Sequence, residues 1–122
     1  MRLTAVLGFQ VAVCRLGIMI PDTVQIGPHL YRVVLVPDGV MDDSGRFGHA
    51  SIERLVIALE AEQPESLLKD TLMHECLHAM LTTLDLEDDL EERVILTLAP
   101  ALLSLANNNP QLWCHFGKCP EN

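Results

Sequence analysis

The stretch LMHECLHAM, residues 72–80, carries two histidines four positions apart, with a glutamate directly after the first. It lies inside a longer segment, SLLKDTLMHECLHAMLTTL, in which apolar residues recur at the three- and four-residue spacing of an α-helix. On a helix, residues four positions apart lie above one another on the same face. The segment therefore predicts a helix that directs the imidazoles of His74 and His78 at a common point.

An H-E-x-x-H helix is typical of zinc hydrolases, in which the two histidines bind the ion and the glutamate reaches the water that the ion activates. The spacing thus favours Zn²⁺ as cofactor and His74 and His78 as two of its ligands. Glu75 would act as the general base in the hydrolysis of an amide bond. The plain alternative is a core helix whose histidines are satisfied by hydrogen bonds.

A catalytic zinc site takes three protein ligands and leaves a fourth position for water. No third histidine follows closely, since the next one along the chain is His115. Asp85 lies two turns from His78 on the same helix, which is too far along the axis to share an ion. The third ligand is therefore expected from the acidic start of the next helix.

Two neighbouring glutamates at that start, Glu91 and Glu92, are the candidates. Glu92 shares a helical face with Ile95, Ala99 and Leu102, an apolar stripe that has to face inward. A carboxylate held inward without a cation is costly, which favours a metal partner. We therefore predict Glu92 as the third ligand, with Glu91 as the competing choice.

The second helix begins in the acidic segment DLEDDLEE, whose carboxylates complement the positive end of the helix dipole. It contains Pro100, which we expect to kink it, and it ends at the NNNP segment. If it packs antiparallel to the first helix, its first turns face the last turns of that helix, where His78 lies. Residues 113–122 predict an irregular tail anchored by Trp113.

The first half of the chain predicts strands. HLYRVVLV, His29–Val36, is dominated by β-branched residues and is followed by the turn sequence PDG. Residues 51–62 are ambiguous, because a helical period and a short strand at 55–60 both fit. Residues 1–20 form an apolar segment that predicts a buried strand, and a signal peptide of a secreted protein or lipoprotein is the minority alternative.

Length and charge restrict the classes of function. A chain of 122 residues suits a single domain, 1–122. Its 17 Asp and Glu residues against 8 Lys and Arg give a net charge of −9, and such a field repels nucleic acid. The N-terminal apolar run is too short to span a bilayer. We expect no nucleic-acid partner, no membrane span and a cytoplasmic location, while the oligomeric state stays open.

The segments TLMHECLHAM and EERVILTLAPALLSLANNNPQL resemble the small H-E-x-x-H zinc metallopeptidase-like proteins of phages and prophages. These proteins are distantly similar to ImmA/IrrE-type and SprT-type peptidases, and the resemblance covers approximately residues 26–112. It implies an α+β, minimal zincin-like fold of the gluzincin kind. In that fold a small antiparallel sheet packs on the H-E-x-x-H helix and a second, Pro-kinked helix.

The same resemblance implies further properties. A glutamate that opens the second helix would be the third ligand, with Glu92 in the nearest register. Residues 55–60 would form a strand beside a peptide or protein substrate, whose backbone could add to an exposed strand edge there. The protein would be phage- or prophage-encoded and would act in the bacterial host cell.

Three functions follow as expectations. The first is a zinc-dependent metallopeptidase that hydrolyses peptide bonds with Glu75 as general base. The second is a catalytically inactive, metal-stabilised protein of phage assembly or host interaction. The third is a helical interaction domain that binds no metal.

Overall fold

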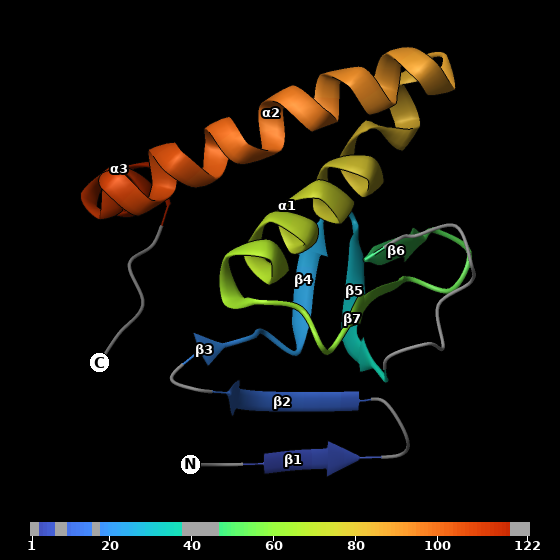
Figure 1. Cartoon of the computed structure of the whole chain (residues 1–122). Coiled ribbons are helices and arrows are strands. Elements are labelled where there is room, and N and C mark those ends of the chain that lie inside the picture. Colours follow the sequence, from blue (N-terminus) through green and yellow to red (C-terminus); the bar gives the residue numbers. More distant parts are fainter. Residues whose placement is uncertain (1–2, 7–9, 16–17, 38–46, 118–122) are drawn as a thin grey trace.

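Seven strands and three α-helices make up the described part of the chain, residues 3–6, 10–15, 18–37 and 47–117 of a computed structural model (Figure 1). The strands are β1 (Leu3–Val6), β2 (Gln10–Arg15), β3 (Ile18–Met19), β4 (Thr23–Ile26), β5 (His29–Val36), β6 (Gly48–Ser51) and β7 (Val56–Glu60). The helices are α1 (Glu65–Leu81), the short 3-10 turn η1 (Thr82–Leu84), α2 (Asp88–Asn108) and α3 (Pro110–Phe116). The predicted α+β class is confirmed.

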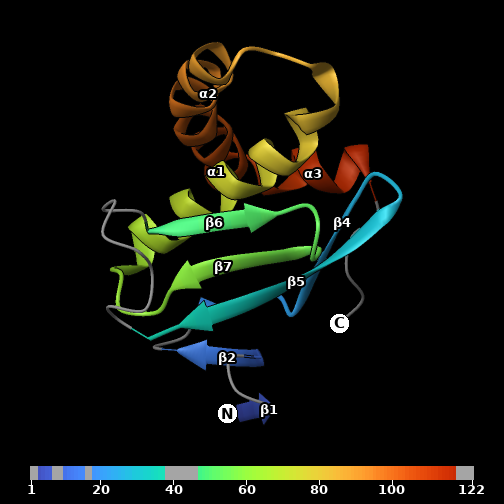
Figure 2. The ribbon, with the colours of Figure 1, turned by 90° about the vertical axis from the view of Figure 1, so that its right-hand side faces the viewer.

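The sheet has the strand order β1-β2-β5-β7-β6, with β3 paired to β2 and β4 paired to β5 (Figure 2). β5 is its central strand, and its last four residues, from Val33 to Val36, are all buried. The prediction of a strand at His29–Val36 is confirmed. One pair, β5 with β7, is parallel, whereas the other pairs are antiparallel. The sheet is therefore mixed, and the expectation of a purely antiparallel sheet is corrected.

Within residues 51–62, a turn at 52–55 leads into strand β7, which confirms the strand predicted at 55–60 and excludes the helix. The expected position of this strand is wrong in one respect, because β7 lies between β5 and β6 and is not at an edge. The chain leaves β5, forms β6 at the outside of the sheet, and returns as β7 between the two. The strand edge at this end of the sheet therefore belongs to β6.

Helix α1 packs across one face of the sheet, where it contacts β4, β6 and β7. The side chains of Leu68 and Ala79 join the core of the sheet, together with the fully buried Ile57 and Leu59 of β7. This burial of an apolar face is what holds α1 in place, since a helix of this length gains little stability by itself. The prediction of a helix around the H-E-x-x-H stretch is confirmed.

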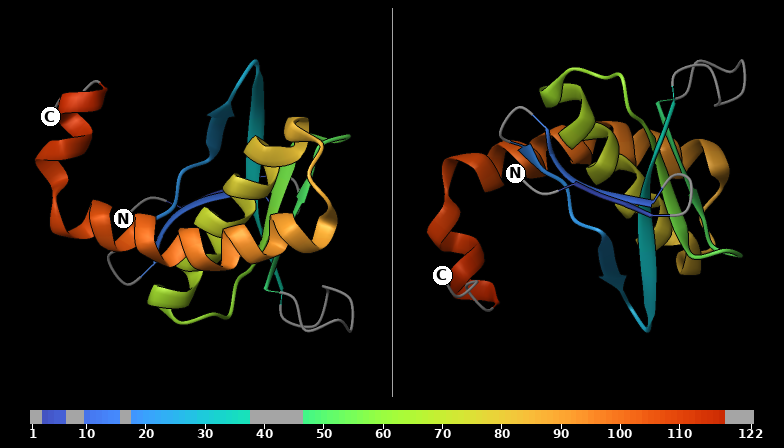
Figure 3. Two further views of the ribbon diagram at one scale, coloured as in Figure 1. Left: turned by 90° about the horizontal axis from the view of Figure 1, so that it is seen from above. Right: turned by 90° about the horizontal axis from the view of Figure 1, so that it is seen from below.

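Helix α2 lies on α1 on the side away from the sheet, and it crosses α1 and extends past it to α3 (Figure 3). A second core cluster joins the two helices: Leu77 of α1 packs with Ile95 and Ala99 of α2, both of which are fully buried. The apolar stripe predicted on this helix thus faces α1. The chain stays helical through Pro100, and α2 ends at Asn108, within the NNNP segment at which the sequence predicts its end.

The tail differs from the prediction, because residues 110–116 form helix α3 and are not irregular. Pro110 stands at the first position of this helix, where its fixed φ angle is suited to helix initiation. Trp113 does not anchor the tail in the core. Its side chain is 40% exposed and packs edge-to-face against Phe116. Residues 118–122 lie outside the described part of the chain.

The N-terminal segment contains the three short strands β1, β2 and β3, whereas the sequence predicts one buried strand for residues 1–20. Residues 1–2, 7–9 and 16–17 lie outside the described part. None of the described helices combines the length and the apolar character that crossing a membrane requires.

Candidate metal centre

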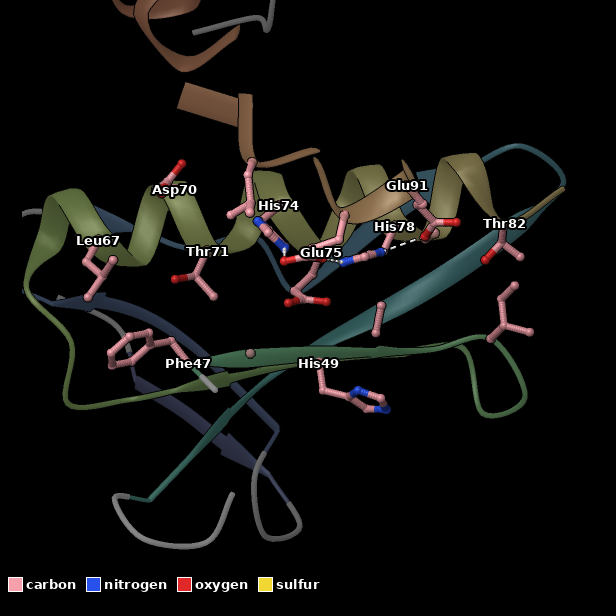
Figure 4. A pocket seen from close by; sticks show the side chains of 16 residues that line it. Phe47, His49, Leu67, Asp70, Thr71, His74, Glu75, His78, Thr82 and Glu91 are labelled. Carbon is pink, nitrogen blue, oxygen red and sulfur yellow. Dashed lines mark hydrogen bonds and ion pairs between the residues drawn. The ribbon is translucent and has the colours of Figure 1, made fainter. Parts of the chain in front are cut away.

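Two histidine rings of α1 lie side by side on the flank that faces α2. Their spacing of four residues brings the ring centroids of His74 and His78 to 4.9 Å in an edge-to-face arrangement (Figure 4). Glu75 is on the neighbouring face of the helix, 8% exposed, and its carboxylate points toward β6 (Figure 4). The helical period of this stretch thus separates the two histidines from the glutamate, as the sequence predicts.

Glu92 of α2 completes a group of three ligand atoms. One carboxylate oxygen lies 2.9 Å from Nε2 of His78, and the other lies 3.4 Å from Nε2 of His74. One atom of each of these three residues lies within 4.8 Å of the others. Ligands at about 2.0–2.1 Å from a tetrahedral zinc ion are roughly 3.3 Å apart. The donor set, two imidazole nitrogens and a carboxylate, and its spacing therefore fit a divalent cation.

Glu91, the competing candidate, reaches the same histidine from the other edge of its ring. Its carboxylate lies 2.7 Å from Nδ1 of His78 (Figure 4). The Nδ1 and Nε2 lone pairs of an imidazole point away from each other in the ring plane, so both cannot face one ion. Glu91 is therefore outside the group that Glu92 forms with His74 and His78.

The electrostatics of the site follow from burial and from its crowded carboxylates. Burial raises the pKa of Glu75, and the nearby histidines oppose this increase without cancelling it. Burial acts to lower the pKa of His78, but the hydrogen bond to Glu91 and the charges of the surrounding glutamates outweigh it and raise that pKa. Both groups consequently hold a proton more tightly than they would in solution.

Strand β6 lies against α1 at the level of Glu75, and this approach depends on Gly48. A Cβ atom at Gly48 would be 2.6 Å from Cγ2 of Thr71 and 3.2 Å from Cγ of Glu75. The hydroxyl of Thr71 donates to the side chain of Gln63 at 2.8 Å. Gln63 in turn donates to the backbone carbonyls of Phe47 and Glu60, both at 2.9 Å. This buried network joins the starts of β6 and α1 and fixes one wall of the site.

A cleft of about 700 Å³ runs between β6, α1 and the first turns of α2, and the two histidines and Glu75 line its middle (Figure 4). Four acidic residues line it, and no lysine or arginine is among the described residues that do so. These acidic residues are Asp70, Glu75, Glu91 and Glu92. The cleft therefore suits a neutral or cationic ligand.

Sequence reasoning identified part of this cleft. His74, Glu75, His78 and Glu92 are brought together, and the roles predicted for them remain predictions. Cys76 is not among the residues that line the cleft, and burial raises the pKa of its thiol to about 11.

Tyr31 and Arg93 do not line the cleft, and Tyr31 is buried in the core of the sheet. Gly48, Gln63 and Thr71 were missed. No local motif marks them, because their part in the wall depends on contacts between segments far apart in the sequence.

Comparisons of this chain with protein-family models, with curated proteins and with solved structures find no match. The geometry and chemistry of the site are therefore the basis for assigning a function.

Proposed function

We propose that this protein is a zinc-dependent metallopeptidase that hydrolyses peptide bonds with Glu75 as general base. The main observation in favour is the position of the Glu92 carboxylate, which has one oxygen near each of the two histidine Nε2 atoms. One carboxylate placed near both imidazole nitrogens is the arrangement that a metal site with three protein ligands requires. The donor set also agrees with the resemblance to H-E-x-x-H metallopeptidases.

His74, His78 and Glu92 would hold the ion and leave one position for water. When bound, zinc would supply a Lewis acid that polarises the carbonyl and acidifies water. The remaining chemistry falls to Glu75, whose carboxylate points into the cleft between α1 and β6. It would take a proton from the attacking water and deliver it to the leaving amine. Its raised pKa favours the first role, because a more basic carboxylate takes up a proton more readily.

The substrate would bind along β6. Among the described strands, β6 pairs with β7 alone, so its other edge offers backbone groups to an added strand. Such an extended peptide would pass the level of Glu75 and the two histidines, which line the same cleft as Gly48 and Ala50 of β6. Backbone pairing of this kind holds a peptide without reading most of its side chains.

The cellular setting belongs to the same proposal. The resemblance to phage and prophage proteins supports a phage- or prophage-encoded enzyme that acts in the cytoplasm of a bacterial host. The net charge of −9 favours basic substrates and disfavours nucleic acid.

Metal analysis and a peptide-library digestion test the proposal. Purified protein should bind one zinc per chain, and Glu75→Gln should keep the zinc while cleavage falls by about 10²–10⁴-fold. Glu62→Gln, which changes an exposed glutamate, is the matched control and should cleave like the parent.

Two results would overturn the proposal. One is a purified protein that binds clearly less than one zinc per chain, and the other is a Glu75→Gln variant that cleaves as well as the parent. Zinc that stabilises a protein unable to cut any peptide would instead support the alternative of a metal-stabilised interaction protein.

A further inference from the structure

Both edges of the His78 ring are occupied by consecutive residues of α2. Nδ1 lies 2.7 Å from Glu91 and Nε2 lies 2.9 Å from Glu92. Consecutive residues of a helix differ by roughly 100° in direction, so two neighbouring glutamates can reach opposite edges of one ring. Only Glu92 also approaches His74.

We infer that Glu91 is a positioning residue of the metal centre: it accepts the Nδ1–H of His78 and so leaves Nε2 free to bind the ion. A neutral imidazole carries one N–H, and the nitrogen without the proton is the one that can bind a metal. An acceptor fixed at Nδ1 selects the tautomer that has its lone pair on Nε2. The inference rests on the proposed function, because it assigns a role toward the same ion.

The exposure of the two glutamates agrees with a positioning role for Glu91 and a metal-ligand role for Glu92. The side chain of Glu91 is 17% exposed, whereas that of Glu92 is 46% exposed. A hydrogen bond between a charged acceptor and a ring N–H is stronger where water is largely excluded. Glu91 is thus placed to hold the ring orientation, and Glu92 lies at the open side, where an ion and a water molecule can be admitted.

Removing such an acceptor has a characteristic cost. Partners that accept a hydrogen bond from a metal-binding histidine contribute about 10–100-fold to metal affinity, without contributing a bond to the metal. A true ligand contributes more, and its loss changes the coordination of the ion. Affinity and coordination measured together therefore separate the two roles.

The experiment compares Glu91→Ala, Glu91→Gln, Glu92→Gln and the parent, with Asp89→Asn as control. Asp89 is exposed and lies in the same acidic first turn of α2, so its change removes a comparable charge without touching the histidines. Three properties are measured: zinc affinity by competition with a chromophoric chelator, the visible spectrum of the Co²⁺-substituted protein, and the proton resonance of the His78 Nδ1–H. Circular dichroism of each metal-free variant confirms that it is folded.

Glu91→Ala should bind zinc about 10–100-fold more weakly than Asp89→Asn and should lose the downfield Nδ1–H resonance, with an unchanged Co²⁺ spectrum. Glu91→Gln, which keeps a carbonyl acceptor, should recover part of the affinity. Glu92→Gln should lose more affinity than either and should alter the Co²⁺ spectrum.

Two results would overturn the inference alone, given a parent that binds zinc. One is an affinity of Glu91→Ala equal to that of Asp89→Asn. The other is a Co²⁺ spectrum that changes in both Glu91 variants, which would make Glu91 a ligand. A parent protein that binds no zinc would overturn the proposed function together with this inference.

Discussion

His78 lies between the carboxylates of Glu91 and Glu92. The stability of the folded protein therefore depends on whether His78 is protonated. The hydrogen bond to Glu91 and the neighbouring charges raise its pKa above the usual 6.5, against the opposing effect of burial. A raised pKa in the folded state stabilises that state at pH values below the unfolded pKa. The stabilisation is lost as pH increases through the folded pKa. The raised pKa of Glu75 acts in the same direction.

Metal-free protein should therefore melt at a higher temperature at about pH 6 than at about pH 8, by on the order of a few degrees. Zinc-loaded protein should show the opposite order, because protons compete with the ion for the imidazoles. Scanning calorimetry in chelator and in excess zinc measures both. His78→Gln should remove most of either dependence. Metal-free protein that becomes more stable from pH 6 to pH 8 would contradict this account of His78.

At the scale of elements, the distance between β6 and α1 is fixed by a residue without a side chain. Gly48 allows the strand to lie against Thr71 and Glu75. The Thr71 side chain cannot freely rotate its methyl group away, because its hydroxyl donates a hydrogen bond to Gln63 at 2.8 Å. An added methyl group at Gly48 would thus have to displace either the strand or the helix.

Gly48→Ala should destabilise the protein by about 1–3 kcal/mol, the usual cost of overpacking a filled interior. It should also reduce peptide cleavage, because the strand that would hold the substrate moves relative to Glu75. Urea denaturation and the cleavage rate measure the two effects. Gly117→Ala is the control, since a Cβ atom there would meet only the Trp113 carbonyl at 3.8 Å. Equal stability of the two variants would show that the approach of β6 is not restrictive.

Elements dominated by local patterns could be predicted from the sequence. The period of α1 and the β-branched run of β5 give their own positions, and the turn chemistry after β5 marks its end. The insertion of β7 between β5 and β6 could not be predicted, because strand order depends on contacts between distant segments. Helix α3 was missed because its short, uncharged segment shows no amphipathic period, although Pro110 is a helix-start signal.

Some residues of the candidate site could likewise be predicted from local patterns, whereas others depend on contacts between distant segments. The motif in α1 gives His74, Glu75 and His78, and the apolar stripe beside Glu92 indicates which glutamate faces them. The position of Glu91 at the opposite edge of the His78 ring could not be predicted, because it depends on how α2 crosses α1 (Figure 3). Likewise, the bond between Thr71 and Gln63 depends on the path of the chain before α1.

The whole molecule carries a net charge of −9. The described residues that line its cleft include four acidic residues and no lysine or arginine. A field of this sign attracts cationic ligands into a cleft, and salt weakens the attraction.

If the proposed activity holds, kcat/KM for a lysine-containing peptide should fall by about threefold to tenfold between 10 mM and 150 mM salt. An uncharged peptide of equal length provides the control and should be cleaved at nearly the same rate throughout. Equal salt dependence of the two peptides would show that the charge of the cleft does not guide binding.

The three groups proposed to hold the ion come from one continuous stretch of chain, from His74 through the η1 turn to Glu92. The opposite wall of the cleft comes from β6, which the sheet holds in place. If these groups bind an ion as proposed, ion binding would depend on one helical hairpin, which could be moved as a single segment into another scaffold. The proposed peptide binding could not be moved in that way, since it would need both the hairpin and the sheet.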